Sequence, residues 1–341
     1  MGNSLFPSYI VATASIKSGR KKPEARHLGD WRELAGIAFQ PTHEETKLRI
    51  EISGSRFVRP STYEVKLVVP GYIYHVFPPL DFDYDALREL THPTPETVTF
   101  KVTDLSYEAE GRTVTTTDSQ TVTMHAISDC PLQHDGEDLT WMLGAYVNEN
   151  SSVIEGILQD GLKAGIVTHF DGYQSGLQDV KDQIFAIWYV LQRRGIKYSD
   201  VTTPSAGSDK IACQTIRPLR DAITYQQANC VDGSVLFASA FRKIGLRTYL
   251  AVIPGHCFVV VLLSEHGPGM LAIETTRLGA GDPAEFPNSP HLSLEVARER
   301  SRASFNEATV YWASRTEMLN RGSGLHIIDL EKWRTDGLTP L

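Results

Sequence analysis

The stretch Asn229-Cys230-Val231-Asp232-Gly233-Ser234 leads into an uncharged run from Val235 to Phe241. The length and composition of this run predict a helix that is buried on all sides. Asn229 is placed to cap the N-terminus of that helix, and Asp232 can reach back to it. Cys230 then lies in the first turn, where the positive end of the helix dipole favours a thiolate.

Two further side chains stand at positions that suit this thiol. His256 follows in an apolar, strand-like segment, and Glu274 ends the next one. Acyl transfer by a cysteine requires a nucleophile, a base beside it and a group that orients the base. We therefore predict that Cys230 attacks, that His256 takes and returns the proton, and that Glu274 holds the imidazole.

Each of these residues also has a plainer interpretation. A cysteine in an apolar run is often a small buried hydrophobe. An isolated histidine in an apolar strand is often a satisfied core residue, and a glutamate at a strand end is often exposed to water. The Glu274 carboxylate favours the catalytic interpretation, because burying it between Ile273 and Thr275 is costly unless it is paired. His256 is the obvious partner.

Acyl transfer also needs hydrogen-bond donors for the oxyanion of the tetrahedral intermediate. The backbone N–H of Cys230 is one predicted donor. The side-chain amide of Gln214 is the predicted second donor and completes the catalytic set, with Gln226 and Gln227 as alternatives.

The order of the metal-binding residue types argues against a zinc site. His256 and Cys257 are consecutive in a strand, so their side chains point to opposite faces. They cannot both bind one ion in a site built from Cys213, Cys230, His256 and Cys257. We expect no metal and no cofactor.

Length and composition limit the class of protein. The 341 residues suffice for about two domains. A formal net charge of −8 makes nucleic-acid binding unexpected. No apolar run reaches the ~18 residues that cross a bilayer, and no secretory segment is recognisable at the N-terminus. The four scattered cysteines do not resemble a disulfide scaffold. We therefore expect a cytoplasmic protein with reduced thiols and no membrane partner.

The pattern along the chain predicts an α+β protein. The polar and basic segment 1–30 is expected to be a loose, flexible arm. Short alternating runs separated by Pro and Gly predict a β-sandwich domain at 31–142. The remainder, 143–341, is expected to be the catalytic domain. It holds an amphipathic helix over Leu177–Leu191, the cysteine helix on an antiparallel sheet, and a C-terminal helix from Leu294 to about Leu319.

Four segments together resemble the transglutaminase-like superfamily, whose core is related to papain-type cysteine peptidases. The segments are Asn229-Cys230-Val231-Asp232, Gly245-Leu246-Arg247, Gly255-His256-Cys257-Phe258 and Glu274-Thr275-Thr276. The resemblance extends over roughly Tyr146 to Thr276, and flanking segments are similar to bacterial members with an N-terminal β domain. It implies a Cys-His-acid triad. The chain departs from the usual pattern at Phe258, where the family commonly has Trp, and at Glu274, where Asp is commoner.

The residues and the resemblance lead to one expected function and two alternatives. We expect a cysteine-dependent amide hydrolase or peptidase that forms a thioester on Cys230 and acts on a peptide or protein substrate. One alternative is a protein transglutaminase or transpeptidase, which passes the acyl group to an amine. The other is a non-catalytic binding or scaffold protein that retains the fold, because the superfamily includes members without activity.

Overall fold

The computed structural model describes residues 4–16, 26–134, 136–200, 211–280, 293–314 and 324–341. Helices and strands both contribute extensively, which confirms the α+β class. The chain divides into two compact units. Unit 1 combines Met1–Glu137 with Ser205–Cys213, and unit 2 combines Asp138–Pro204 with Gln214–Leu341.

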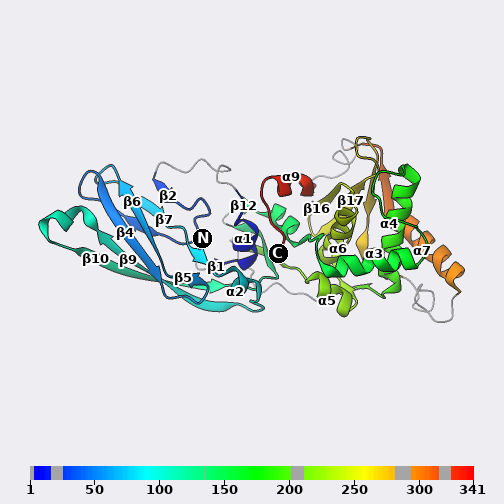
Figure 1. Cartoon of the computed structure of the whole chain (residues 1–341), viewed down its shortest axis with the longest axis horizontal. Helices are drawn as coiled ribbons and strands as arrows, with labels where there is room; N and C mark the ends of the chain where they lie inside the picture. The colour runs from blue at the N-terminus through cyan, green and yellow to red at the C-terminus, as the bar shows by residue number, and fades with distance from the viewer. Residues whose placement is uncertain (1–3, 17–25, 135, 201–210, 281–292, 315–323) are drawn as a thin grey trace. The chain divides into compact units, whose positions relative to one another are not determined.

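Unit 1 is built mainly from strands (Figure 1). Its largest sheet has the order β1-β10-β9-β4-β6. Alternation explains these strands: Leu48, Ile50 and Ile52 of β4 are buried, and the residues between them are at least partly exposed. The strands of this sheet are β1 (Ser4–Leu5), β4 (Thr46–Ser53), β6 (Ser61–Leu67), β9 (Thr94–Asp104) and β10 (Val114–Met124).

Smaller elements complete unit 1. A sheet with the order β2-β7-β3 contains β2 (His27–Gly29), β3 (Ile37–Phe39) and β7 (Tyr74–Phe77). A third sheet has the order β12-β11-β14, in which β14 belongs to this unit as far as Cys213. The remaining bounds are β5 (Val58–Arg59), β8 (Asp81–Phe82), α2 (Tyr84–Arg88), η1 (Leu105–Glu110), β11 (Asp129–His134), β12 (Glu137–Asp138) and β14 (Ile211–Thr215).

The expectation of a loose arm at 1–30 is wrong for residues 4–16. Strand β1 pairs in parallel with β10, and every residue of α1 (Pro7–Ala12) is buried. The physical reason is that Leu5, Phe6 and Ile10 are large apolar side chains, each at most 2% exposed, and their burial outweighs the polar composition around them. Residues 1–3 and 17–25 of the expected arm lie outside the described residues.

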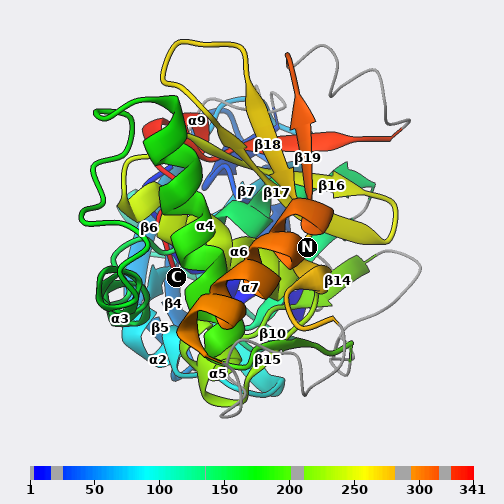
Figure 2. The same ribbon diagram turned by 90° about the vertical axis from the view of Figure 1, so that its right-hand side faces the viewer.

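Unit 2 is organised around an antiparallel sheet with the order β19-β18-β17-β16-β20. Helix α6 packs against β16 and β17, and α4 contacts α3, α6 and α7. Figure 2 shows α4 and α7 side by side, with α6 behind them. The sheet strands are β16 (Thr248–Ile253), β17 (His256–Leu262), β18 (Met270–Ile273), β19 (Thr309–Trp312) and β20 (His326–Asp329). The helices are α3 (Ser152–Lys163), α4 (Leu177–Arg193), α5 (Leu219–Thr224), α6 (Cys230–Lys243), α7 (Leu294–Ala308) and α9 (Leu330–Thr335).

The connection after α4 carries further short elements of unit 2. Strand β13 (Lys197–Tyr198) pairs in parallel with β15 (Gln227–Ala228), and β15 leads directly into α6. The 3-10 helices of this unit are η2 (Thr140–Tyr146) and η3 (Thr275–Arg277). Within the described part of the chain, no helix combines the length and apolar character that crossing a bilayer requires.

Two predictions about helices in unit 2 have different outcomes. Every residue of α6 from Val231 to Phe241 is buried, which confirms the helix that is covered on all sides. The helix predicted from Leu294 to about Leu319 ends instead at Ala308, and Thr309–Trp312 forms β19. The segment Thr-Val-Tyr-Trp is β-branched and aromatic, and pairing with β18 as a new edge strand decides its conformation.

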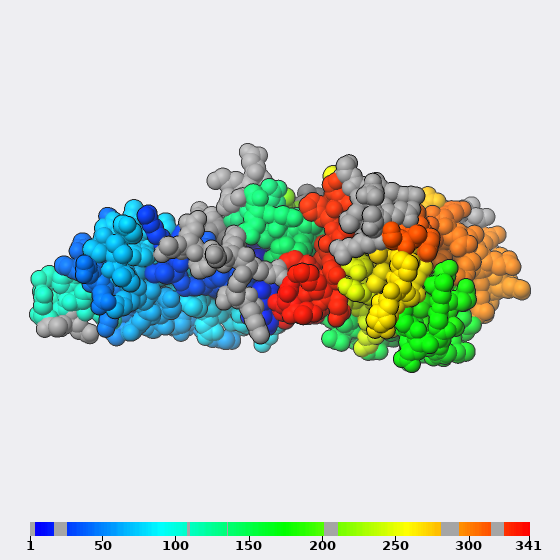
Figure 3. Space-filling view, turned by 90° about the horizontal axis from the view of Figure 1, so that it is seen from above, coloured from blue at the N-terminus to red at the C-terminus, as the bar shows by residue number. Residues whose placement is uncertain are grey.

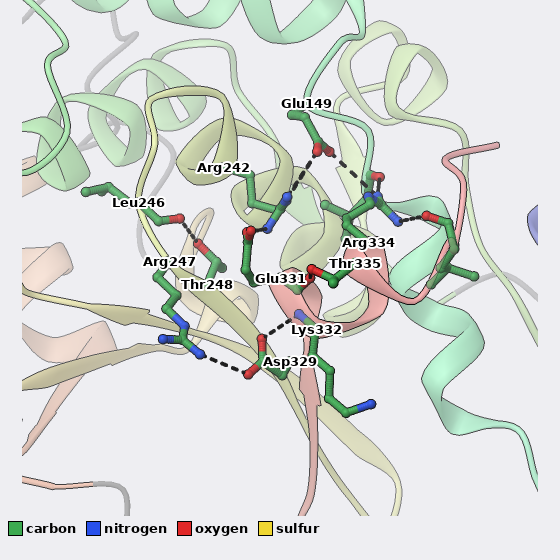
Figure 4. Close-up of polar contacts among 12 residues, drawn as sticks. Glu149, Arg242, Leu246, Arg247, Thr248, Asp329, Glu331, Lys332, Arg334 and Thr335 are labelled. Carbon is green, nitrogen blue, oxygen red and sulfur yellow. Dashed lines mark hydrogen bonds and ion pairs between the residues drawn. The ribbon is translucent and has the colours of Figure 1, made fainter. Parts of the chain in front are cut away.

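Ion pairs of Arg242, one of them largely buried, hold the last turn of α6 (Figure 4). Arg242 lies 3.2 Å from a carboxylate oxygen of Glu149 and 3.2 Å from one of Glu331 in α9. Arg334 of α9 approaches the other Glu149 oxygen at 3.6 Å. Only 12% of the Arg242 side chain and 20% of the Glu149 side chain are exposed. The pairs connect the C-terminal end of α6 to the C-terminal residues, which Figure 3 shows packed beside the segment that holds β16 and β17.

We predict that Arg242→Ala lowers the free energy of unfolding of the protein by about 3 kcal/mol, because it leaves Glu149 without its principal cation in a buried place. The matched control is Lys332→Ala. Lys332 pairs with Asp336 at 2.7 Å, but its side chain is 65% exposed, so its loss is expected to cost less than about 1 kcal/mol. Denaturant unfolding measures both variants, and equal losses would contradict the structural role of Arg242.

Candidate active site

The first turn of α6 begins at Cys230, as the sequence predicts. The Asn229 side chain accepts hydrogen bonds from the backbone N–H of Val231 and Asp232, at 2.9 and 2.8 Å. The Asp232 carboxylate accepts in return from the Asn229 backbone N–H at 3.1 Å, which completes a capping box. This double cap fixes the backbone on both sides of Cys230 and confirms the predicted helix start.

The negative charge of Asp232 has a partner that the sequence analysis did not identify. Arg217 donates to one Asp232 oxygen from its backbone N–H at 2.8 Å, and its guanidinium lies 2.9 Å from the other. Asp232 is buried, and that burial raises the pKa of its carboxyl. The pair is 15 residues apart in sequence, and nothing in the local pattern around Arg217 indicates it.

His256 and Glu274 meet at the ends of two adjacent strands. The register of β17 and β18 places Val259 opposite Ile273, so Glu274, the next residue, lies near the start of β17. His256 Nε2 is 2.6 Å from Glu274 Oε2. The two side chains are 29% and 35% exposed, so the pair is open to solvent on one side. The contact leaves Nδ1 as the ring nitrogen that Glu274 does not engage.

The other oxygen of Glu274 is held by Thr276. Glu274 Oε1 accepts a hydrogen bond from the Thr276 hydroxyl at 2.6 Å and one from its backbone N–H at 3.1 Å. Both carboxylate oxygens therefore have fixed partners, and the carboxylate is aimed at the imidazole. The ring of Phe258 stacks beside His256, with the ring centroids 6.3 Å apart. Thr276 enters the sequence analysis only through the family resemblance, which assigns it no role.

The sulfur of Cys230 lies against the peptide that joins His256 to Cys257. The backbone N–H of Cys257 is close enough to lower the pKa of the Cys230 thiol, and the Glu274 carboxylate is close enough to raise it. Cys257 turns its own thiol toward Ser234 of α6 and is only 1% exposed. The structure thus brings Cys230, His256 and Glu274 into one site, and it separates the side chains of His256 and Cys257 as strand alternation predicts.

A glycine permits this close approach of helix and strand ends. A Cβ atom on Gly233 would lie 2.7 Å from the hydroxyl oxygen of Thr275 and 2.9 Å from its Cβ. Thr275 directly follows Glu274, and its hydroxyl donates to the Cys230 carbonyl oxygen at 3.4 Å. Only a residue without a side chain fits at position 233, so the glycine sets the distance between the thiol and the acid.

The environment of the thiol disfavours its charged form. Burial raises the pKa of the Cys230 thiol, and the carboxylates of Glu274 and Asp200 act in the same direction. The hydrogen bonds from the N–H groups of Cys257 and Val231 lower it, but burial outweighs them. This direction differs from the expectation that the helix start favours a thiolate. The resting thiol is therefore protonated near neutral pH, and attack on a carbonyl requires a base to take the proton.

The predicted second oxyanion donor is not directed at the thiol. The Gln214 amide donates to the carbonyl oxygen of Thr215, its neighbour in sequence, at 2.9 Å. Gln226, one of the alternatives, donates to the Arg194 carbonyl oxygen at 2.8 Å. Backbone carbonyl groups bind both amides, one of them next in sequence and the other 32 residues away, and sequence distance from Cys230 does not indicate either bond. The side chain of Gln227 is exposed.

No group of three or more His, Cys, Asp or Glu side chains in the described ranges is arranged to hold a metal ion. All four cysteines are free thiols, of which Cys130 and Cys257 are buried.

Comparisons with protein-family models, with curated proteins and with solved structures found no match to this chain.

We predict that Thr276→Val slows acylation of Cys230 by p-nitrophenyl acetate about 10-fold or more, because a hydrogen bond to a charged group contributes about 1.5–3 kcal/mol. Thr276→Ser keeps the hydroxyl and is expected to retain most of the rate. Mass spectrometry of the peptide containing Cys230 measures the acylation. A valine variant that reacts like the wild type, or a serine variant as slow as the valine variant, would contradict the positioning role.

The raised pKa of the thiol predicts the pH dependence of its alkylation. The rate at which iodoacetamide labels Cys230 should rise through alkaline pH, with a midpoint above the value of about 8.5 for an exposed thiol. A short cysteine peptide is the reference, and Cys130 and Cys257 should stay unlabelled until the protein unfolds. A midpoint at or below neutral pH would show instead a thiolate that is already stabilised in the resting protein.

Proposed function

We propose that the protein is a cysteine-dependent amide hydrolase or peptidase of the cytoplasm that acts on a peptide or protein substrate. In this proposal unit 2 carries a transglutaminase-like core and unit 1 is an N-terminal β-sandwich that binds substrate or partner. The observation that carries the proposal is the 2.6 Å contact between His256 and Glu274, next to the peptide whose N–H contacts the Cys230 sulfur. A base oriented by an acid beside a thiol is the arrangement that cysteine acyl transfer requires.

The proposed reaction has two halves. As sulfur bonds to the carbonyl carbon of the amide, the thiol proton moves to His256 Nδ1, and Glu274 stabilises the imidazolium through Nε2. The intermediate then expels the amine, which receives the proton from the imidazolium, and a thioester remains on Cys230. Water, deprotonated by His256, attacks this thioester. The acid leaves, and the thiol regains its proton.

General-base removal of the thiol proton fits the electrostatics of this site. Because burial and two carboxylates raise the thiol pKa, a preformed ion pair is not required by the proposal. The half-exposed imidazole can exchange protons with water in the second half of the reaction. Hydrolysis is preferred over transfer because water is always present, whereas an amine acceptor needs a further binding cleft.

The proposal is tested with the purified protein and a mixture of proteins as substrate, by mass spectrometry of new peptide termini and of glutamine side chains converted to glutamate. We predict products with the wild type, none with Cys230→Ala, and about 10²–10⁴-fold less with His256→Ala. Cys213→Ala is the matched control, since this cysteine is partly exposed but has no role in the proposed reaction.

A fluorescent primary amine in the same mixture separates the alternatives. Its stable incorporation into the substrates, dependent on Cys230, supports a transglutaminase or transpeptidase. Products that persist in Cys230→Ala, or no products under any condition, contradict the hydrolase and favour the scaffold alternative.

A further inference from the structure

Strand β13 runs directly beside the residues that lead into Cys230. Tyr198 of β13 pairs with Ala228 of β15 in a parallel register. The backbone N–H of Ser199 donates to the Ala228 carbonyl oxygen at 3.1 Å, so the two segments stay together up to this point. Cys230 is only two residues beyond Ala228. The pairing therefore holds the backbone of Tyr198 at the N-terminus of α6.

Strand β13 also contacts η3, the turn that directly follows Glu274. These two contacts place Tyr198 near enough to Cys230 and Glu274 for their charges to raise the pKa of its phenol. The side chain is 48% exposed, and it makes no hydrogen bond to another described residue. A tyrosine with an exposed side chain, paired two residues before the thiol, can meet a substrate that enters the site.

The second donor for the oxyanion of the proposed reaction is not among the described glutamine amides with known partners, those of Gln214 and Gln226. The backbone N–H of Cys230 is one donor, at the helix position where such groups have no partner within the helix. The Gln214 amide is bound to the Thr215 carbonyl oxygen. The carboxylates of Glu274 and Asp200, both in range of the sulfur, repel an additional negative charge. A donor is therefore needed on the side of the site that these groups occupy.

We propose that the Tyr198 hydroxyl is this second donor and is thus a further catalytic residue; the inference rests on the proposed function of Cys230. Phenol hydroxyls serve as oxyanion donors in other enzymes. Partial burial and the neighbouring negative groups raise the pKa of Tyr198, which keeps the hydroxyl protonated and able to donate over the working range of a hydrolase.

The role of an oxyanion donor can be isolated with two thiol reagents, only one of which forms an oxyanion. With p-nitrophenyl acetate, sulfur bonds to the carbonyl carbon, the π electrons move onto oxygen, and the collapse of this oxyanion expels p-nitrophenolate and leaves an acetyl thioester. With iodoacetamide, sulfur displaces iodide from a saturated carbon, and no oxyanion forms. The thiol proton is lost in both reactions. Only the first should depend on an oxyanion donor.

The test compares wild type with Tyr198→Phe, which removes only the hydroxyl, and follows both modifications on the Cys230 peptide by mass spectrometry at one pH. We expect acylation to slow by about 10²-fold, the lower part of the range for loss of one oxyanion donor, with alkylation unchanged. The matched control is Tyr225→Phe, a tyrosine that is 64% exposed and for which no interaction with Cys230 is found.

Each result has a separate meaning. If Tyr198→Phe changes neither rate, or slows both equally, the hydroxyl does not act on the oxyanion and the inference is overturned while Cys230 remains a nucleophile. If Cys230 of the wild type is alkylated but never acylated, the proposed function fails and the inference fails with it. Loss of acylation alone, absent in Tyr225→Phe, supports the assignment.

Discussion

The contact between the first turn of α6 and the ends of β17 and β18 is the constraint on which the candidate site depends. Gly233 and Thr275 approach so closely that no side chain fits at position 233. The capping box of Asn229 and Asp232 fixes the helix at that point, and Arg217 balances the buried carboxylate. Because the helix start lies so close to the strand ends, the sulfur lies near the peptide that follows His256.

This arrangement couples burial to chemistry. Packing the thiol between helix and sheet removes water from it, which raises its pKa and makes it a poor nucleophile at rest. The same packing places the His256–Glu274 pair beside it, with Thr276 holding the second carboxylate oxygen. In the proposed reaction, an oriented base compensates for a thiol that is protonated at rest. This differs from a site in which the helix dipole stabilises the thiolate before the substrate binds.

Much of the site could be predicted from sequence because its main residues lie in recognisable local sequence patterns. A capped helix start with a cysteine in the first turn, a histidine in an apolar strand and a glutamate at the end of the next strand each have a local pattern. The partners of these residues do not. Arg217 and Tyr198 join the site through pairings over 15 and 30 residues, which no local periodicity encodes. Gln214 is not directed at the oxyanion because its amide donates to the carbonyl oxygen of the next residue, Thr215.

The fold shows the same division. The cysteine helix is buried from Val231 to Phe241 as its composition indicates, whereas the end of α7 is decided by an edge strand that the sequence of the helix does not reveal. Residues 4–16 depart from the expected loose arm because a few apolar side chains are buried in a segment whose overall composition is polar and basic.

The most direct test of the central claim, that the thiol and the imidazole act as a pair, is nitrogen NMR of the His256 ring before and after methylthiolation of Cys230. Modification should move the Nδ1 signal strongly while Nε2 remains the protonated nitrogen bound to Glu274. A ring whose two nitrogen signals are the same before and after the modification would contradict the coupling, and with it the assignment of His256 as the base.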